Sequence, residues 1–144
     1  MTSSPVIQKI QELTESYVCI YCIESSDGFD EISTLVDELN CSYKEFFAAA
    51  KLIDISQAQT LLSAMFHQRL AYSDVIMPID QARSLAHEFL SNLDEPAKLY
   101  SNCFSDDEVS GVGSWIPVTD RTFEALLYCE TEKHSILVIA VDED

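Results

Sequence analysis

Glycine and basic residues are both scarce in this chain. Only three glycines occur among its 144 residues, Gly28, Gly111 and Gly113. A glycine-rich phosphate loop and a dinucleotide-binding fingerprint need glycines at fixed spacings, so the common kinds of nucleotide chemistry are excluded. Lysine and arginine number 8 against 25 aspartates and glutamates, a formal net charge of −17. Because binding to nucleic acid or anionic lipid depends on cationic side chains, we expect no nucleic acid partner and no membrane partner.

Long apolar runs are also missing. No run approaches the roughly 18 apolar residues of a membrane-spanning helix. The stretch Met1–Pro5 has neither the positive region nor the apolar core of a signal peptide. We therefore expect a cytoplasmic protein. The cysteines are five, an odd number, which in that compartment predicts reduced thiols and not a disulfide framework.

Two of these cysteines, Cys19 and Cys22, have the C-x-x-C spacing. Their neighbours Tyr17, Val18 and Ile23 are apolar or aromatic, whereas a redox pair needs solvent access and a lowered pKa. A zinc site would need a second ligand pair at a suitable spacing, which the sequence lacks. We expect free thiols that pack as small hydrophobic side chains. An enzyme with Cys19 or Cys22 as its nucleophile is an alternative that a reactive thiol would reveal.

Histidine, the usual general base, occurs three times, at His67, His87 and His134. Nothing in the sequence brings any of them to a serine or cysteine nucleophile. His87 is followed by Glu88 but lacks the second histidine of the zinc protease motif. We expect no catalytic residue and no enzyme activity.

A calcium loop is the one metal site that the acids near Gly28 suggest. Asp27, Asp30 and Glu31 lack the alternating oxygen ligands of such a loop. They are better explained as acids at the start of a helix, where they favour the helix dipole. We expect neither a metal nor a cofactor.

Length and composition predict one folded domain, residues 1–144. The chain is 47% hydrophobic and 23% charged, which is typical of globular proteins. In the first two-thirds, apolar residues recur every three or four positions, which predicts helices. Ser42 and Glu45 form a capping-box pattern, and Asp80 is a candidate N-cap. Helices are expected to begin at Pro5 and after Ser42. Three further helices are expected over 29–39, about 56–70 and 81–93.

The apolar pattern changes in the last third. Strands are expected over 115–118, 123–129 and 135–141, the last two as a hairpin. The run 136–141 is apolar on both faces and should be a central strand. The segment Tyr17–Ile23 fits either a buried helix end or a short strand, and we favour the helix. The predicted fold class is α+β, with a helical N-terminal two-thirds packed on a C-terminal antiparallel β-sheet.

Acidic residues concentrate in that last third. Residues 101–144 contain ten acids and only two bases, Arg121 and Lys133. An acidic run at 106–108 leads through two glycines to the only tryptophan, and aromatic anchors ringed by polar residues are typical of interaction hot spots. Two simpler readings stay open: the charge serves solubility, and the tryptophan belongs to the core. The expected partner-binding residues are Asp106, Asp107, Glu108, Trp115 and Asp120.

The stretch 113–123, GSWIPVTDRTF, and the strand over 136–144 resemble the C-terminal parts of small bacterial immunity proteins. Proteins of that kind accompany contact-dependent growth inhibition and related toxins. The resemblance implies a cytoplasmic protein that binds and blocks a toxin domain, often a basic nuclease. It covers about 30 residues and transfers no functional residue.

Charge and resemblance lead to the same functional hypothesis. We expect a non-catalytic inhibitor whose carboxylates occupy the basic, substrate-binding surface of a toxin or nuclease. The acidic excess disfavours self-association, so we expect a monomer in the absence of the partner. The alternative is a cytoplasmic chaperone or adaptor for an exported protein, which would need an apolar groove and a homodimer.

Overall fold

The fold is known from a computed structural model, which describes residues 4–36, 39, 41–105, 107–109 and 111–143. These residues form five helices and seven strands in mixed order, so the α+β class is confirmed. The helices are α1 (Pro5–Leu13), α2 (Phe29–Leu35), α3 (Tyr43–Ala49), α4 (Ile55–His67) and α5 (Ile79–Ser91). The strands are β1 (Val18–Ile23), β2 (Lys51–Ile53), β3 (Lys98–Ser101), β4 (Cys103–Phe104), β5 (Ser114–Trp115), β6 (Phe123–Glu130) and β7 (Ser135–Asp142).

Five strands form one antiparallel sheet in the order β1-β7-β6-β3-β2, and β4 and β5 form a separate pair. β6 and β7 make the predicted hairpin, with Glu130 opposite Ser135. The first strand pairs with the last, so that Val18 lies opposite Ala140. β7 is therefore an interior strand, as its apolar run predicted, and β1 and β2 are the two edges of the sheet.

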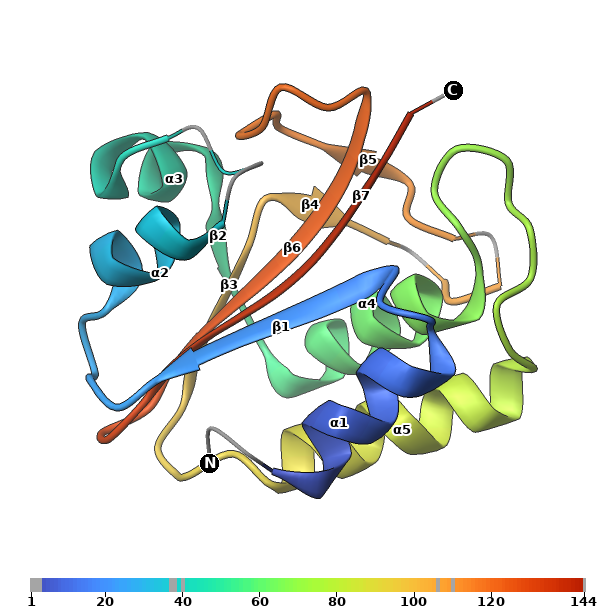
Figure 1. Cartoon of the computed structure of the whole chain (residues 1–144), viewed down its shortest axis with the longest axis horizontal. Coiled ribbons are helices and arrows are strands. Elements are labelled where there is room, and N and C mark those ends of the chain that lie inside the picture. Colours follow the sequence, from blue (N-terminus) through green and yellow to red (C-terminus); the bar gives the residue numbers. More distant parts are fainter. Residues whose placement is uncertain (1–3, 37–38, 40, 106, 110, 144) are drawn as a thin grey trace.

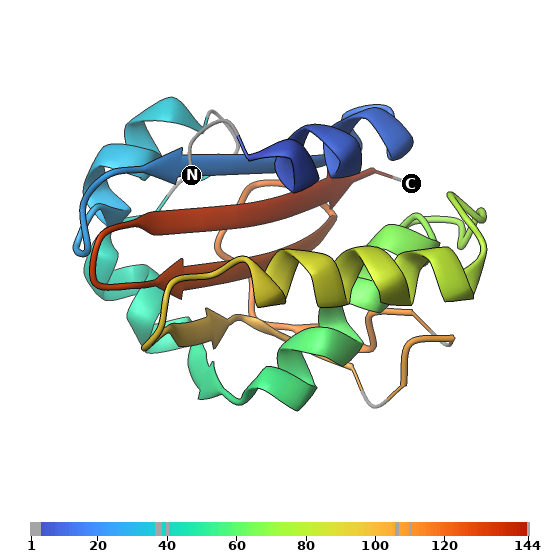
Figure 2. The same cartoon turned by 90° about the horizontal axis from the view of Figure 1, so that it is seen from below.

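Helices cover both faces of this sheet (Figures 1 and 2). α1, α4 and α5 pack on one face, and α2 and α3 pack on the other. Successive side chains of a strand point to opposite faces. In β6, Leu127 accordingly joins the first helix layer, while Leu126 and Tyr128 join the second. Burial on both faces explains why β6 and β7 are apolar without alternation.

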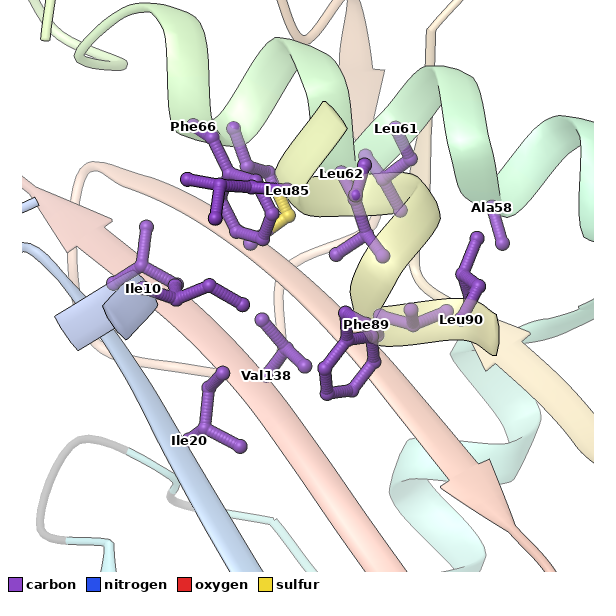
Figure 3. Close-up of a cluster of buried hydrophobic side chains, with 14 of the residues drawn as sticks. Ile10, Ile20, Ala58, Leu61, Leu62, Phe66, Leu85, Phe89, Leu90 and Val138 are labelled. Atoms are coloured by element: carbon purple, nitrogen blue, oxygen red, sulfur yellow. The ribbon is translucent and has the colours of Figure 1, made fainter. Parts of the chain in front are cut away.

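The larger core lies under α1, α4 and α5. Figure 3 shows Leu62 and Phe66 of α4 and Leu85 and Phe89 of α5 gathered near Val138 of β7. All five side chains are buried. Each contributes roughly 1.5 to 3 kcal/mol of transfer free energy relative to an exposed position. The apolar helix faces predicted from the sequence are thus the faces that build this core.

The smaller core under α2 and α3 is aromatic. The ring of Phe29 stacks on that of Phe46 with centroids 4.7 Å apart, and both meet the ring of Tyr128 edge-on. The predicted capping box starts α3: the Glu45 N–H donates to the Ser42 hydroxyl, and the Ser42 N–H donates to the Glu45 carboxylate. The cap fixes the start of the helix that carries Phe46 into this core.

The prediction that Tyr17–Ile23 continues the first helix is wrong, because most of this segment is β1. α1 ends at Leu13, and Glu15 and Ser16 then adopt φ values of 51° and 63°. This left-handed backbone reverses the chain and delivers it to β7. A short segment that is apolar on all sides fits a buried helix and a buried strand equally well.

Other parts of the layout also differ from the prediction. The sheet is not confined to the C-terminal third, because β1 and β2 belong to the helical first two-thirds. The helix predicted over 29–39 ends at Leu35. The N-cap of α5 is Pro78, and Asp80 lies in the first turn, where its carboxylate is 3.3 Å from a guanidinium nitrogen of Arg83. Helix ends are harder to predict than the apolar face, because they depend on single residues.

Candidate functional site

The predicted acidic run at 106–108 is partly neutralised within the chain. Asp106 lies outside the described residues. Asp107 is exposed and accepts a 2.9 Å hydrogen bond from the N–H of Val109. Glu108 is partly buried and forms an ion pair with the guanidinium of Arg83 on α5. A carboxylate that is already paired steers a basic partner less than an unpaired one.

Asp120 lies away from that run. It is exposed and follows Thr119, which forms a β-bridge with Leu39, next to the layer of α2 and α3. Glu108 contacts α5, which belongs to the layer on the other face of the sheet. The structure therefore does not bring Asp120 together with Glu108.

Trp115 is half-buried at the end of β5, so the predicted strand over 115–118 is shorter than expected. Its ring packs on that of Phe123 with centroids 5.7 Å apart and also packs against the larger core. The same two side chains line a cavity of about 270 Å³ with residues of the α4–α5 loop and of the segment 111–113. This position is compatible with both the core role and the anchor role.

Glu124 of β6 is a functional candidate that the sequence did not single out. Its side chain is fully buried, and no ion pair to it forms among the described residues. Four donors satisfy it instead: the Asn102 side-chain amide at 2.6 Å, the Val118 N–H at 2.9 Å, and the Thr119 N–H and hydroxyl at 3.0 and 2.7 Å. The carboxylate thereby fixes the connection between β5 and β6. The sequence did contain a signal for this residue, because Glu124 is the single acid inside an otherwise apolar predicted strand.

Carboxylates from three distant segments gather at one end of the sheet, which we name the acidic end. The three segments are the β1–α2 loop, the α5–β3 loop and the β6–β7 turn, which lie together in both views (Figures 1 and 2). They also line a shared pocket of about 590 Å³. The carboxylates of the acidic end are Glu24, Asp27, Asp94, Glu95, Glu130 and Glu132.

Specific contacts hold the segments of the acidic end together. The Gly28 N–H donates a 2.9 Å hydrogen bond to the Ser135 hydroxyl, which ties the β1–α2 loop to β7. A Cβ atom at Gly28 would lie only 1.9 Å from Cδ1 of Ile23, so glycine permits the close approach. Nδ1 of His134 lies 2.9 Å from the Asp94 carboxylate and joins the turn to the α5–β3 loop.

The acidic end differs in charge pairing from the opposite end. No lysine or arginine of the described chain forms an ion pair with the carboxylates of the acidic end. Asp94 contacts Nδ1 of His134, and Lys98, which lies opposite Glu130, lines the same pocket. All three arginines lie instead toward the other end, where each pairs with an acid. These pairs are Arg69 with Asp142, Arg83 with Asp80 and Glu108, and Arg121 with Glu143.

An apolar cleft adjoins the acidic end. It has a volume of about 690 Å³ and shares Pro96 with the acidic pocket. Asp54 and Glu95 stand beside its apolar wall. The apolar lining residues are Ile53, Ile55, Leu90, Leu93, Pro96, Ala97 and Leu99.

All five cysteines are free, as predicted. Cys19 packs with the smaller core and Cys22 with the larger one, so the two thiols of the C-x-x-C pair lie on opposite faces of the sheet. Burial raises the pKa of Cys22, and it raises the pKa values of Cys41 and Cys103 to about 11 and about 12. A high thiol pKa disfavours the thiolate that a nucleophile or metal ligand needs.

In the part of the chain that the structure describes, no group of three or more His, Cys, Asp or Glu side chains could hold a metal ion. Nor is any helix in these residues both long enough and apolar enough to pass through a bilayer.

Comparison with protein-family models, curated proteins and solved structures gives no match.

Proposed function

We propose that this chain is a non-catalytic, cytoplasmic binding protein that neutralises a basic protein partner, as an immunity protein does when it blocks a toxin or nuclease domain. The observation that carries the proposal is the acidic end. Its six carboxylates make a single ion pair among the described residues, through His134. Such a surface attracts a cationic protein and accelerates the encounter.

The acidic end is also positioned on a rigid frame. Glu130 ends β6, and Asp27 and Asp94 are tied to the sheet through the contacts of Gly28 and His134. A surface that is ordered before binding loses little conformational entropy when the partner docks. Carboxylates held in this way can take the places of phosphate groups on a nuclease.

The described residues among those predicted from the sequence form a second docking candidate. Asp107 and Glu108 would serve as a charged rim near the aromatic anchor Trp115, with Asp120 on a separate surface, while Asp106 lies outside the described residues. We favour the acidic end because Glu108 is already paired with an arginine.

The test uses the product of the neighbouring gene as the candidate partner. Association is measured by stopped-flow fluorescence at 50 and 500 mM NaCl. We expect the association rate constant to fall at least tenfold at high salt, since exposed charges are screened. A salt-independent rate constant would contradict the proposal.

Two sets of variants locate the docking surface. Glu24→Gln, Glu130→Gln and Glu132→Gln together should slow association at 50 mM NaCl by about tenfold if the acidic end docks. The matched control is Asp107→Asn with Glu108→Gln, which removes acids at the other end. If only the control slows association, the surface predicted from the sequence is the docking surface.

The apolar cleft favours the second candidate function, a chaperone or adaptor for an exported protein. Its aliphatic lining suits an apolar segment of a client. Ile55→Asp places a charge in the cleft at an exposed position. A client held in the cleft would be lost from this variant and kept by the variants of the acidic end.

A further inference from the structure

The apolar cleft combines buried and exposed aliphatic side chains. Leu90 and Leu93 at the end of α5 and Leu99 of β3 are at most 8% exposed and form its floor. Ile55, the first residue of α4, is 58% exposed and forms part of its wall. An aliphatic side chain that stays exposed beside a buried apolar floor leaves room for an apolar group of another molecule.

The charged side chains that line the cleft are both acidic. They are Asp54, the N-cap of α4, and Glu95 in the α5–β3 loop, and each is exposed. Asp54 accepts a 2.7 Å hydrogen bond from the Gln57 N–H, which uses one of its two oxygens. Among the described residues, neither carboxylate forms an ion pair. An apolar segment without bases would therefore meet two carboxylates that it cannot neutralise.

The acidic pocket continues this negative charge beyond Pro96. Pro96 lines both cavities, Glu95 and Ala97 line the cleft, and Lys98 lines the pocket. Lys98 is the one base among the described residues that line the two cavities, against five acids. These acids are Asp27, Asp54, Glu95, Glu130 and Glu132. The surface on the two sides of Pro96 is therefore both apolar and negative.

Two cavities elsewhere in the molecule have a different charge. Arg69 lines both of them, one together with Glu15 and Asp74 and the other without an acid among its described lining residues. They suit a cationic partner less, because the guanidinium of Arg69 repels it. Charge complementarity therefore favours the cleft and the acidic pocket as the place where a basic, partly apolar segment binds.

We propose that the cleft and the acidic pocket together hold one segment of the basic partner, in which aliphatic side chains lie between arginines or lysines. The inference rests on the proposed function and names the part of the partner that is recognised. The aliphatic side chains fill the cleft beside Ile55, and the basic side chains lie near Glu95 and, beyond Pro96, near Glu130. Because the cavities share Pro96, side chains a few residues apart in one segment reach both. Burial of the aliphatic groups supplies affinity, and the carboxylates select against apolar segments that have no bases.

The test titrates the nitrogen-15-labelled protein with synthetic peptides. Two-dimensional NMR spectra are recorded in 50 mM NaCl with the peptide GKRLLRKG at up to 2 mM. We expect saturable shifts of the backbone amides of residues 53–55 and 90–99, and no shift in the α4–α5 loop. The peptide GKRSSRKG keeps only the bases, and GEELLEEG keeps only the apolar pair. Each should bind about tenfold more weakly than GKRLLRKG.

Two variants examine the two parts of the site. Ile55→Ser removes the exposed aliphatic side chain of the wall, and Glu95→Lys reverses the charge beside it. Each should weaken the binding of GKRLLRKG by about fivefold. Val75→Ser and Glu12→Lys make equivalent changes at exposed positions elsewhere and should bind as the wild type does. The spectrum of each free variant shows whether it is folded, and either folded variant suffices for the test.

Three results would overturn the inference. These are no saturable binding of GKRLLRKG, equal binding of either control peptide, and undiminished binding to a folded cleft variant. Equal binding of GEELLEEG would also favour the chaperone alternative, whose client needs no bases.

Failure of this inference is distinguishable from failure of the proposed function. A neighbouring gene product whose association depends on salt, together with a peptide that does not bind here, would overturn the inference and leave the proposed function standing. Saturable peptide binding here, together with a salt-independent association of the gene product, would contradict the proposed function alone.

Discussion

The side-chain amide of Asn102 donates a 2.6 Å hydrogen bond to the carboxylate of Glu124, and both side chains are fully buried. The same amide donates to the Ile116 carbonyl at 2.9 Å. Together the pair links the end of β3, the β5–β6 connection and β6. A buried charge is tolerated here because several donors replace the water it has lost.

Removal of this carboxylate should be costly. Glu124→Ala leaves the Val118 N–H, the Thr119 N–H and one of the two N–H groups of the Asn102 amide without an acceptor, so we expect a loss of about 3 kcal/mol in the free energy of unfolding. That corresponds to a melting temperature about 10 °C lower. Glu132→Ala, an exposed control, should stay within about 0.5 kcal/mol of the wild type. Urea unfolding of both variants measures the difference, and a loss below about 1 kcal/mol for Glu124→Ala would show that water replaces the carboxylate.

Asp142 should make stability depend on pH in the acid range. Burial acts to raise the pKa of Asp142, but hydrogen bonds from the Tyr17 hydroxyl and the N–H groups of Glu143 and Ala71, with the charge of Arg69, outweigh it and lower the pKa below 3.8. A lowered folded pKa means that this stabilisation is present above about pH 4 and is lost as pH falls through the folded value.

Asp142→Asn should therefore lower the free energy of unfolding by about 1 kcal/mol at pH 7. The gap to the wild type should close below about pH 3. Thermal melts from pH 2.5 to pH 7 measure it, with the exposed Glu12→Gln as the control. A gap that is the same at every pH would show that packing, and not charge, is lost.

Trp115→Ala separates the anchor role from the core role. If Trp115 is a docking anchor, dissociation of the partner should become faster, at a cost of about 2 kcal/mol or more in affinity. If it belongs to the core, the variant should lose about 3 to 5 kcal/mol in folding stability. Thermal melting and dissociation kinetics of the same variant decide this. A large fall in melting temperature with unchanged kinetics in the folded fraction would exclude docking.

The thiols should resist alkylation under native conditions. Burial raises the pKa of Cys41 from 9.0 to about 11, which lowers its thiolate fraction at pH 8 about 100-fold. We expect labelling by iodoacetamide to be about 100-fold slower than in 6 M guanidinium chloride, with Cys103 and Cys129 slower still because they are buried. Mass spectrometry follows each site. Rapid labelling of Cys19 or Cys22 in the native protein would support the alternative that this chain is an enzyme with one of them as its nucleophile.

The helices were the most predictable part of the fold. α4 and α5 are long enough for their apolar positions to repeat over several turns. The N-terminal cap of α3 depends on only two residues, Ser42 and Glu45, which are close in sequence. β2 and β3 contain three and four residues, which is too short for a pattern. Their assignment depends on pairing with each other across about 50 residues of chain, and no local signal reports that.

The candidate site was predictable only in part. Glu130 and Glu132 lie at the turn of the predicted hairpin, but their approach to Asp27 and Pro96 depends on the register of the sheet and on where α5 ends. The neutralisation of Glu108 by Arg83 likewise joins residues that are 25 positions apart. Charge counted along a sequence does not show which carboxylates the fold leaves unpaired.

The pairing of β1 with β7 has a consequence for biosynthesis. Val18 pairs with Ala140, so the first strand leaves the ribosome long before β7, its neighbour in the sheet of the described residues. The sheet cannot close until β7 has been synthesised, and until then β1 and β6 expose apolar side chains and unpaired peptide groups. A stop codon or a frameshift before residue 135 would remove an interior strand, and the nascent chain would go to chaperones and proteases instead of persisting as a shortened protein.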